Sequence, residues 1–225
     1  MSKNKGSEPQ QVSDKETEII LSIAEDILDG RIKAVDGGPL EGDFCEFGCY
    51  RGDTSLLLEK LLENHYRKLT NDSLRRSLWI YDSFEGLPPK SPEDSSVAGD
   101  SFQAGKLLVT KREVVERFKK ASLRVPRIRK GFFDQLDDSI DSRDLPEKIA
   151  FAFLDGDLYS SIKTSFTLIA SRMVPGGIVI VHDYNNPQLP GVAKAVDEWL
   201  TSMRTAQKIS PTLLSVRETL AIIKL

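Results

Sequence analysis

Short apolar runs alternate with helix-like segments along most of the chain, and this alternation constrains the fold more than any other feature of the sequence. Residues 78–81, 149–154 and 178–181 are almost continuously apolar, as expected for strands that are buried on both faces. Apolar residues recur at helical spacing between these runs, for example over residues 160–173. Strands that alternate with helices predict a parallel sheet covered on both faces, and therefore an α/β fold.

The remaining elements follow the same logic until the last residues. Strands are expected at residues 42–48, 78–81, 125–131, 149–154 and 178–181, and helices at residues 16–31, 54–62, 114–118 and 160–173. Pro175, Gly176 and Gly177 are expected to turn the chain before the fifth strand. Two β-like runs, 212–216 and 219–225, are separated by Arg217 and Glu218, which predicts an antiparallel hairpin. A mostly parallel sheet with a C-terminal antiparallel hairpin is typical of the Rossmann-like class I methyltransferase fold rather than of dehydrogenases.

The length and composition fit one domain. A chain of 225 residues with 40% apolar side chains can bury a single sizeable core, so residues 15–225 are expected to form one domain. Residues 1–14 are polar and interrupted by Gly and Pro, so a flexible tail is expected there. Cys45 and Cys49 have no further cysteines around them to form a disulfide framework, which indicates buried thiols and a reducing, cytoplasmic location.

Charge and hydropathy argue against several classes of partner. The formal net charge is only −3 and the basic residues are scattered among acidic ones, so neither nucleic acid nor a membrane surface is an expected partner. No apolar run reaches the roughly 18 residues that span a bilayer, and the first residues lack the apolar stretch of a signal peptide. A small-molecule partner fits better, and association into a homo-oligomer is left open.

Candidate functional residues are sought at the carboxyl ends of the strands, because ligands of open α/β sheets bind there. The first strand runs into the string E-F-G-C-Y-R-G, in which Gly48 and Gly52 allow close approach of the backbone to a ligand. The carboxylate of Glu46 can accept hydrogen bonds from an ammonium group. The G-x-x-x-G spacing differs from the G-x-G-x-x-G of dinucleotide-binding folds. A glycine loop also occurs as a plain turn, so this loop alone leaves function open.

Two further strand ends carry candidate cofactor contacts. Asp82 ends the second strand, where its carboxylate can bind both hydroxyls of a ribose; the alternative is a helix cap or a loop carboxylate. Residues 85–106 form a long loop, and loops of that length are usually lids or disordered, so this loop is a candidate cover for the acceptor. Beside the third strand end, Phe132 and Phe133 offer ring faces to an adenine, although core packing explains them equally well.

The fourth and fifth strand ends carry the strongest constellation. Asp155 and Asp157 follow the fourth strand, and His182 and Asp183 follow the fifth. Neighbouring strands lie about 5 Å apart, so these side chains are expected to converge. Carboxylates and an imidazole are suitable ligands for a divalent metal ion, which predicts a metal site at Asp155, His182 and Asp183. The alternative is that the two aspartates cap strand ends and that His182 packs as a neutral side chain.

Four strings of the sequence together resemble the macrocin O-methyltransferase family, also called the TylF family. They are the run from Glu46 to Thr54, the string D-S-F-E-G-L-P from Asp82, the string L-D-G-D-L-Y from Leu154, and Pro175-Gly176-Gly177 leading to His182-Asp183. The resemblance covers about residues 41–200. It implies transfer of a methyl group from S-adenosylmethionine to a hydroxyl group, commonly on a sugar of a natural product, with magnesium.

The resemblance also assigns site residues. The cofactor would be surrounded by Glu46, Gly48, Arg51, Gly52, Asp82 and Ser83, with Phe133 as a further candidate contact, while Asp155 and Asp183 would hold the metal. The chain departs from the family at His182, where family members usually carry an aspartate. A nitrogen ligand would favour Mn²⁺, Fe²⁺ or Zn²⁺ in addition to Mg²⁺. The family's D-T-L-P string after Phe133 is also absent.

The expected mechanism follows from the chemistry of a sulfonium methyl group, which is already activated. The enzyme must place a hydroxyl oxygen in line with this methyl group and remove the hydroxyl proton. Asp155 is the expected base, with Asp157 second, and a divalent metal would assist. Three alternatives stay open: a methyltransferase for phenolic or catechol hydroxyls, a nicotinamide-dependent oxidoreductase, and a binding protein that keeps the cofactor site without activity.

Overall fold

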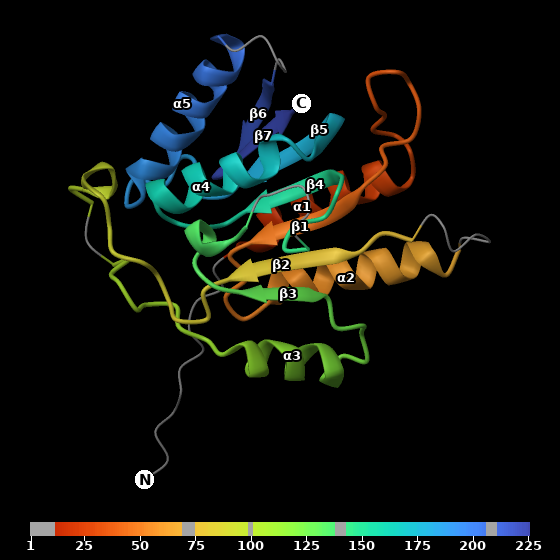
Figure 1. Cartoon of the computed structure of the whole chain (residues 1–225), viewed down its shortest axis with the longest axis horizontal. Helices are drawn as coiled ribbons and strands as arrows, with labels where there is room; N and C mark the ends of the chain where they lie inside the picture. The colour runs from red at the N-terminus through yellow and green to blue at the C-terminus, as the bar shows by residue number, and fades with distance from the viewer. Residues whose placement is uncertain (1–11, 69–74, 99–100, 138–142, 206–210) are drawn as a thin grey trace.

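A single mixed sheet forms the centre of the protein (Figure 1). The computed structural model describes residues 12–68, 75–98, 101–137, 143–205 and 211–225. Within these residues the sheet has seven strands in the order β3-β2-β1-β4-β5-β7-β6. The strands are β1 (Asp43–Phe47), β2 (Leu78–Asp82), β3 (Arg127–Lys130), β4 (Ile149–Leu154), β5 (Met173–Val181), β6 (Thr212–Arg217) and β7 (Leu220–Lys224).

The strand directions confirm the predicted fold class. β1 pairs in parallel with β2 and β4, and the outer pairs β2–β3 and β4–β5 are also parallel. β7 is antiparallel to both β5 and β6, so the predicted C-terminal hairpin is present. The carboxyl ends of β1, β2, β4 and β5 therefore meet at one edge of the sheet, on both sides of the position where the strand order reverses.

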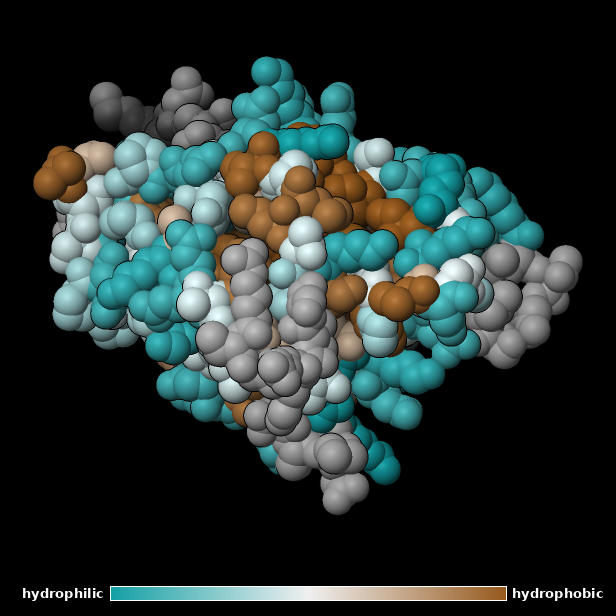
Figure 2. All heavy atoms as spheres, turned by 90° about the horizontal axis from the view of Figure 1, so that it is seen from above, coloured by the Kyte–Doolittle hydropathy of each residue, from teal (hydrophilic) through white to brown (hydrophobic). Residues whose placement is uncertain are grey.

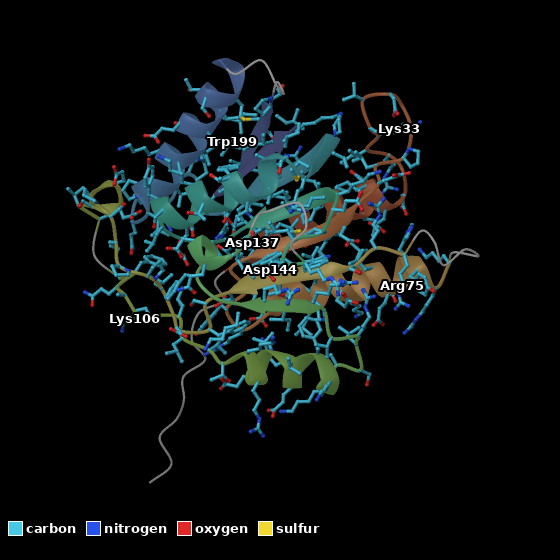
Figure 3. The ribbon with its side chains drawn as sticks, in the orientation of Figure 1. Lys33, Arg75, Lys106, Asp137, Asp144 and Trp199 are labelled. Carbon is cyan, nitrogen blue, oxygen red and sulfur yellow. The ribbon has the colours of Figure 1, made fainter. Side chains whose placement is uncertain are left out.

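Helices cover both faces of the sheet (Figure 1). They are α1 (Asp14–Leu28), α2 (Asp53–Tyr66), α3 (Lys111–Lys120), α4 (Tyr159–Ala170) and α5 (Pro190–Thr205), with short 3₁₀ turns η2 (Pro92–Asp94) and η3 (Phe133–Gln135). Alternate residues of a strand point to opposite faces, so Phe44 belongs to the core cluster that includes residues of α1, α2 and α3, whereas Cys45 belongs to the cluster that includes residues of α4 and α5. Trp199 of α5, labelled in Figure 3, stacks on Phe166 of α4 with ring centroids 4.2 Å apart.

Several expected boundaries are corrected by the structure. The third strand is shorter than the predicted 125–131, because only Arg127–Lys130 pairs with β2. Residues 175–177, expected as a turn, lie inside β5, and the pairing of β5 with β4 shifts register between Ile149 and Phe151. Gly176 has a positive φ of 93° within this irregularity, a conformation that favours glycine. Helix α5 is an addition to the predicted elements.

The predicted tail ends earlier than expected. Ser13 caps α1 with a capping box, in which the Glu16 backbone N–H donates to the Ser13 hydroxyl and the Ser13 backbone N–H donates to the Glu16 carboxylate. The Val12 side chain is buried. The prediction of a flexible segment up to residue 14 is therefore wrong for these last residues, while residues 1–11 lie outside the described part of the chain.

Figure 2 shows apolar side chains gathered among polar ones on the face of the protein seen from above. Leu214 and Val216 of β6 are among the exposed large hydrophobic residues. Among the described residues, no helix combines the length and the apolar character needed to cross a membrane. Cys45 and Cys49 are both buried and carry free thiols.

Candidate active site

A pocket lies at the edge of the sheet where the carboxyl ends of β1, β2, β4 and β5 meet. Its walls come from the glycine loop after β1, the loop after β2, the segment after β3, and the ends of β4 and β5. The lining residues are Gly48, Tyr50, Asp82, Ser83, Gly86, Leu87, Pro88, Phe102, Leu107, Phe132, Phe133, Asp155, Gly156, Asp157, Ser161, His182, Asp183 and Asn186. This is the edge at which the sequence predicts a ligand site.

Gly48 lets the ends of β1 and β4 approach closely. Its φ is +89°, and a Cβ atom at this position would lie 2.0 Å from the backbone oxygen of Asp155. The Asp155 backbone N–H donates to the Phe47 oxygen at 2.8 Å, which continues the pairing of the two strands. Any side chain at residue 48 would therefore push the Asp155 backbone away from its observed place.

Asp82 holds the glycine loop as well as lining the pocket. One carboxylate oxygen accepts hydrogen bonds from the backbone N–H groups of Cys49 and Tyr50, at 3.0 and 3.1 Å. The other oxygen accepts from the Phe84 N–H at 2.7 Å. These three bonds give Asp82 the role of a carboxylate that holds a loop, which is the alternative that the sequence analysis offered to ribose binding. A carboxylate has about four acceptor sites, so three backbone bonds leave capacity for a ribose hydroxyl.

The long loop after β2 forms one wall of the pocket. The Ser83 hydroxyl donates to the Gly86 oxygen at 2.7 Å and accepts from the Glu85 N–H at 3.1 Å, which fixes the start of the loop. Farther along, the fully buried carboxylate of Asp94 accepts the first backbone N–H of α4, that of Tyr159, at 2.7 Å. The Ser83 bonds thus hold the loop in a local turn, and the Asp94 bond fastens it to α4.

Two aromatic rings close the pocket near β3. Phe132 and Phe133 both line it. The Phe133 ring meets the Phe47 ring edge to face, with centroids 5.4 Å apart. Phe133 therefore makes a core contact and also presents a surface to the pocket, and the contact with an adenine stays a prediction.

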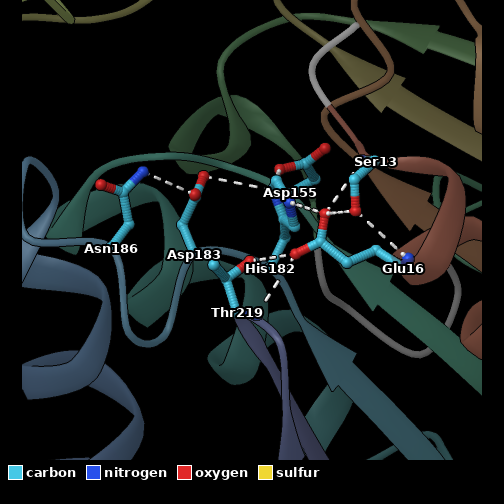
Figure 4. Close-up of polar contacts among 7 residues, drawn as sticks. All are labelled: Ser13, Glu16, Asp155, His182, Asp183, Asn186 and Thr219. Atoms are coloured by element: carbon cyan, nitrogen blue, oxygen red, sulfur yellow. Dashed lines mark hydrogen bonds and ion pairs between the residues drawn. The ribbon is translucent and has the colours of Figure 1, made fainter.

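Asp155, His182 and Asp183 come together as predicted (Figure 4). The Nδ1 atom of His182 lies 2.8 Å from an oxygen of Asp155 and 3.1 Å from an oxygen of Asp183. The second oxygen of Asp183 accepts from the side-chain amide of Asn186 at 2.8 Å. One ligand atom from each of the three residues lies within 4.8 Å of the other two, so the donor set fits a divalent cation.

A third carboxylate approaches the imidazole from its other side. An oxygen of Glu16, on α1, lies 3.6 Å from the Nε2 atom of His182, and the side chains of both residues are only 6% exposed. The ring thus stands between Glu16 on one side and two aspartates on the other, as Figure 4 shows. The sequence analysis missed Glu16 because it counted this residue only as the start of a helix over residues 16–31.

The titratable groups of this cluster shift one another's pKa values. Burial alone would lower the pKa of His182, but Asp155, Asp183 and Glu16 outweigh burial and hold it well above its ordinary value. Burial raises the pKa of Asp155, and the neighbouring His182 opposes that rise. Burial and the charge of Asp155 raise the pKa of Asp157 well above its ordinary range. A cation bound at Nδ1 would have to displace a proton from this ring.

Three predicted cofactor residues do not line this pocket. Gly52 caps α2 with a φ of +78° and packs against Val114 of α3. The Arg51 guanidinium lies over the ring of Tyr50, 5.1 Å from its centroid. Glu46 is buried, and its carboxyl group accepts a hydrogen bond from the Ser55 hydroxyl at the start of α2. The other predicted residues, Gly48, Asp82, Ser83, Phe133, Asp155, His182 and Asp183, all line the pocket.

Glu46 gives a testable pH dependence of stability. Burial, opposed by the Ser55 hydrogen bond, raises the pKa of Glu46 from 4.5 to about 8. The folded state therefore holds this proton more tightly than the unfolded state, and the associated stability is lost as pH rises from about 4.5 through 8. We expect Glu46→Gln, a neutral isostere, to reduce the fall in the free energy of unfolding between pH 5 and 9 by a few kcal/mol.

Urea unfolding of wild type and Glu46→Gln at several pH values would measure this difference. The comparison cancels contributions from groups that titrate alike in both proteins. Parallel stability curves for the two proteins across that range would show that Glu46 keeps an ordinary pKa in the folded state.

Comparison with known proteins relates this site to a family. The family model described as macrocin-O-methyltransferase (TylF) matches residues 26–222. Demethyldecarbamoylnovobiocin O-methyltransferase of Streptomyces niveus is 29% identical over 202 residues, which are 87% of this chain and 69% of that protein. A tetracenomycin-C rhamnosyl 4'-O-methyltransferase of Streptomyces olivaceus is 33% identical over 155 residues, 66% of this chain and 54% of that protein. The chain thus spans between about half and two thirds of these relatives' lengths.

Solved structures agree with this relationship. The O-methyltransferase NovP superimposes with a TM-score of 0.71 at 25% identity, covering 96% of this chain and 81% of that protein. The calicheamicin methyltransferase CalS11 superimposes with a TM-score of 0.68 at 20% identity, covering 95% and 80%, which shows the shared fold. The predicted class I methyltransferase fold is confirmed by these similarities and by the strand order.

Proposed function

Because the chain belongs to the macrocin-O-methyltransferase family, as its sequence predicted, we propose that it transfers a methyl group from S-adenosylmethionine to a hydroxyl group of a natural-product sugar. The observation that carries this proposal is one pocket lined by Gly48 and Asp82, at the ends of β1 and β2, and by Asp155 and His182, at the ends of β4 and β5. The first pair suits an adenosine-bearing cofactor and the second suits deprotonation of a hydroxyl. The named acceptors of the relatives, which include a rhamnosyl group, support a sugar.

In the proposed reaction S-adenosylmethionine supplies a methyl group activated on a sulfonium. Asp155 accepts the hydroxyl proton while the acceptor oxygen forms its new bond to carbon and the bond from sulfur to carbon breaks. His182 holds the Asp155 carboxylate by the 2.8 Å contact, which keeps the basic oxygen in one place. Leu87, Pro88 and Phe102 of the loop after β2 give this pocket an apolar wall, which would keep water from the reacting groups.

We also propose that Asp155, His182 and Asp183 hold a divalent cation. A cation bound there would act as a Lewis acid and lower the pKa of an acceptor hydroxyl. The support is the donor set itself, with three ligand atoms within 4.8 Å of one another. With one nitrogen ligand we expect Mn²⁺, Fe²⁺ or Zn²⁺ to be accepted in addition to Mg²⁺. A cytoplasmic location and a homo-oligomeric state stay predictions.

The proposed function predicts binding and transfer that calorimetry and mass spectrometry can measure. We expect S-adenosylmethionine, and not NAD⁺, to bind, and Asp82→Ala to weaken that binding by roughly 1 to 3 kcal/mol as hydrogen bonds are lost. The control is Glu85→Ala, in the same loop but exposed. Methyl transfer would be measured with rhamnosyl and catechol acceptors, with Mg²⁺, with Mn²⁺ and with a chelator.

Each result of that experiment decides one part of the proposal. Methylation of rhamnosyl acceptors supports the sugar assignment, and methylation of catechols alone would favour the phenolic alternative. Cofactor binding without transfer to any acceptor would contradict the proposed activity and favour the alternative of a binding protein without activity. Equal turnover with chelator and with metal would contradict metal assistance. Unchanged affinity in Asp82→Ala would contradict the ribose contact.

A further inference from the structure

The carboxylate of Glu16 accepts more hydrogen bonds than a helix cap requires. In a capping box, the third residue of the helix returns one carboxylate oxygen to the N-cap residue. Here one oxygen of Glu16 accepts from the Ser13 backbone N–H at 2.9 Å and from the Ser13 hydroxyl at 2.7 Å. That pair of bonds completes the cap of α1 and explains only one of the two oxygens.

The second oxygen of Glu16 binds a residue near the other end of the sequence. It accepts from the Thr219 hydroxyl at 2.5 Å and from the Thr219 backbone N–H at 3.2 Å, in the turn between β6 and β7. Four donors therefore hold a carboxylate that is almost completely buried. Together with the contact to His182, they hold the pKa of Glu16 well below its ordinary range although burial acts to raise it.

The fixed carboxylate faces the one edge of the His182 ring that the aspartates leave free. Nδ1 is in contact with Asp155 and Asp183, whereas Nε2 has the Glu16 oxygen at 3.6 Å. This distance is longer than a hydrogen bond, so Glu16 acts on the ring chiefly through its charge. An imidazole can turn over about its Cβ–Cγ bond, which exchanges each ring nitrogen with a ring carbon, and the assigned orientation depends on what faces each nitrogen. A carboxylate opposite Nε2 favours a proton on that atom.

We propose that Glu16 is a positioning residue, which fixes the orientation of the His182 imidazole and keeps Nδ1 directed at Asp155 and Asp183. Helix α1 is then a part of the active site, although it packs on one face of the sheet and contributes no residue to the pocket wall. The importance of this orientation for catalysis rests on the proposed methyl transfer. The orientation itself does not, and it is measurable in the absence of an acceptor.

The chain makes the measurement simple because it has two histidines. His65→Gln removes the second set of imidazole signals and assigns the signals of His182 in ¹H–¹⁵N spectra. In this background we would compare Glu16→Gln, which removes the charge but keeps the shape, with Glu18→Gln. Glu18 is an exposed glutamate two residues farther along α1 and serves as the matched control.

We expect Glu16→Gln to shift or broaden both ring nitrogen signals of His182 and to lower kcat by roughly 10- to 100-fold, with the affinity for S-adenosylmethionine unchanged. Glu18→Gln should leave all three quantities as in wild type. His182 signals that coincide in wild type and folded Glu16→Gln would overturn the proposal. So would a loss of stability in Glu16→Gln with those signals unmoved, because Glu16 would then serve only the cap and the turn.

A second variant covers the case in which Glu16→Gln does not fold. Thr219→Val removes the hydroxyl donor to Glu16 but keeps the charge and the helix cap. A shifted or broadened His182 signal in Thr219→Val supports positioning through Glu16, and a signal identical to wild type contradicts it. If wild type transfers no methyl group at all, the proposed function fails, whereas the spectra still decide the role of Glu16.

Discussion

Asp155→Asn is expected to lower kcat by roughly two to four orders of magnitude, the usual contribution of a positioned general base. The amide has nearly the same shape as the carboxylate but cannot accept the hydroxyl proton. Asp155 lines the pocket, and its carboxylate contacts Nδ1 of His182 at 2.8 Å. The affinity for S-adenosylmethionine should change little, so single-turnover rates together with calorimetry would locate the loss in the chemical step.

Asp157→Asn is the informative comparison for this variant. Asp157 also lines the pocket, and burial and the charge of Asp155 raise its pKa, which favours the neutral carboxyl group over a basic carboxylate. Its φ of 60° is one that asparagine tolerates. We therefore expect a clearly smaller loss of kcat than in Asp155→Asn. The reverse order would identify Asp157 as the base, and an Asp155→Asn variant with wild-type kcat would exclude Asp155.

Gly48→Ala is expected to destabilise the protein by about 3 to 5 kcal/mol, since it combines overpacking with a left-handed backbone. The added Cβ would lie 2.0 Å from the Asp155 oxygen and 2.8 Å from the Asp155 carbonyl carbon. Both are backbone atoms, so no side chain can move aside to relieve the contact. Where folded protein is recovered, Asp155 will be displaced and kcat will fall even under conditions that fully populate the native state.

Gly30→Ala separates the two causes of that loss. Gly30 has a similar φ of +70°, but a Cβ atom there would have open space around it. Gly30→Ala should lower the free energy of unfolding by only about 1 kcal/mol, the cost of an alanine in the left-handed conformation, and should keep full activity. Denaturant unfolding of both variants measures the difference. A loss of equal size in the two would mean that the β1 and β4 ends separate easily to admit a methyl group.

The parts of the fold that are visible in the sequence are those determined by local pattern. A strand that is buried on both faces has a continuous apolar run, so the predicted bounds 149–154 agree with β4. Parallel neighbours bring their carboxyl ends together, and Asp155, His182 and Asp183 therefore converge as predicted. Their roles in metal binding and catalysis stay predictions. The sequence predicts a turn at residues 175–177, where the structure has an irregularity within β5, because Pro and Gly are common both in turns and in irregular parts of strands.

The parts that the sequence did not reveal depend on contacts between distant segments. Ser13 and Glu16 have the spacing of a capping box, which already accounts for the glutamate, and its other partner Thr219 is 203 residues away. Arg51 and Gly52 belong to the matched family string, yet the path of the chain after Gly48 turns them toward Tyr50 and α3. Asp94 lies in a polar loop of the sequence, and its role is visible only in the structure, where the first backbone N–H of α4 donates to its carboxylate.

The position of β7 between β5 and β6 sets an order of assembly during synthesis. β6 is translated before β7 but has no partner in the sheet until β7 has been inserted beside β5. Thr219, in the turn between them, is also made after every other residue that holds Glu16 or faces His182. A nascent chain whose parallel strands had folded before the hairpin emerged from the ribosome would therefore still lack the two hydrogen bonds from Thr219 to Glu16.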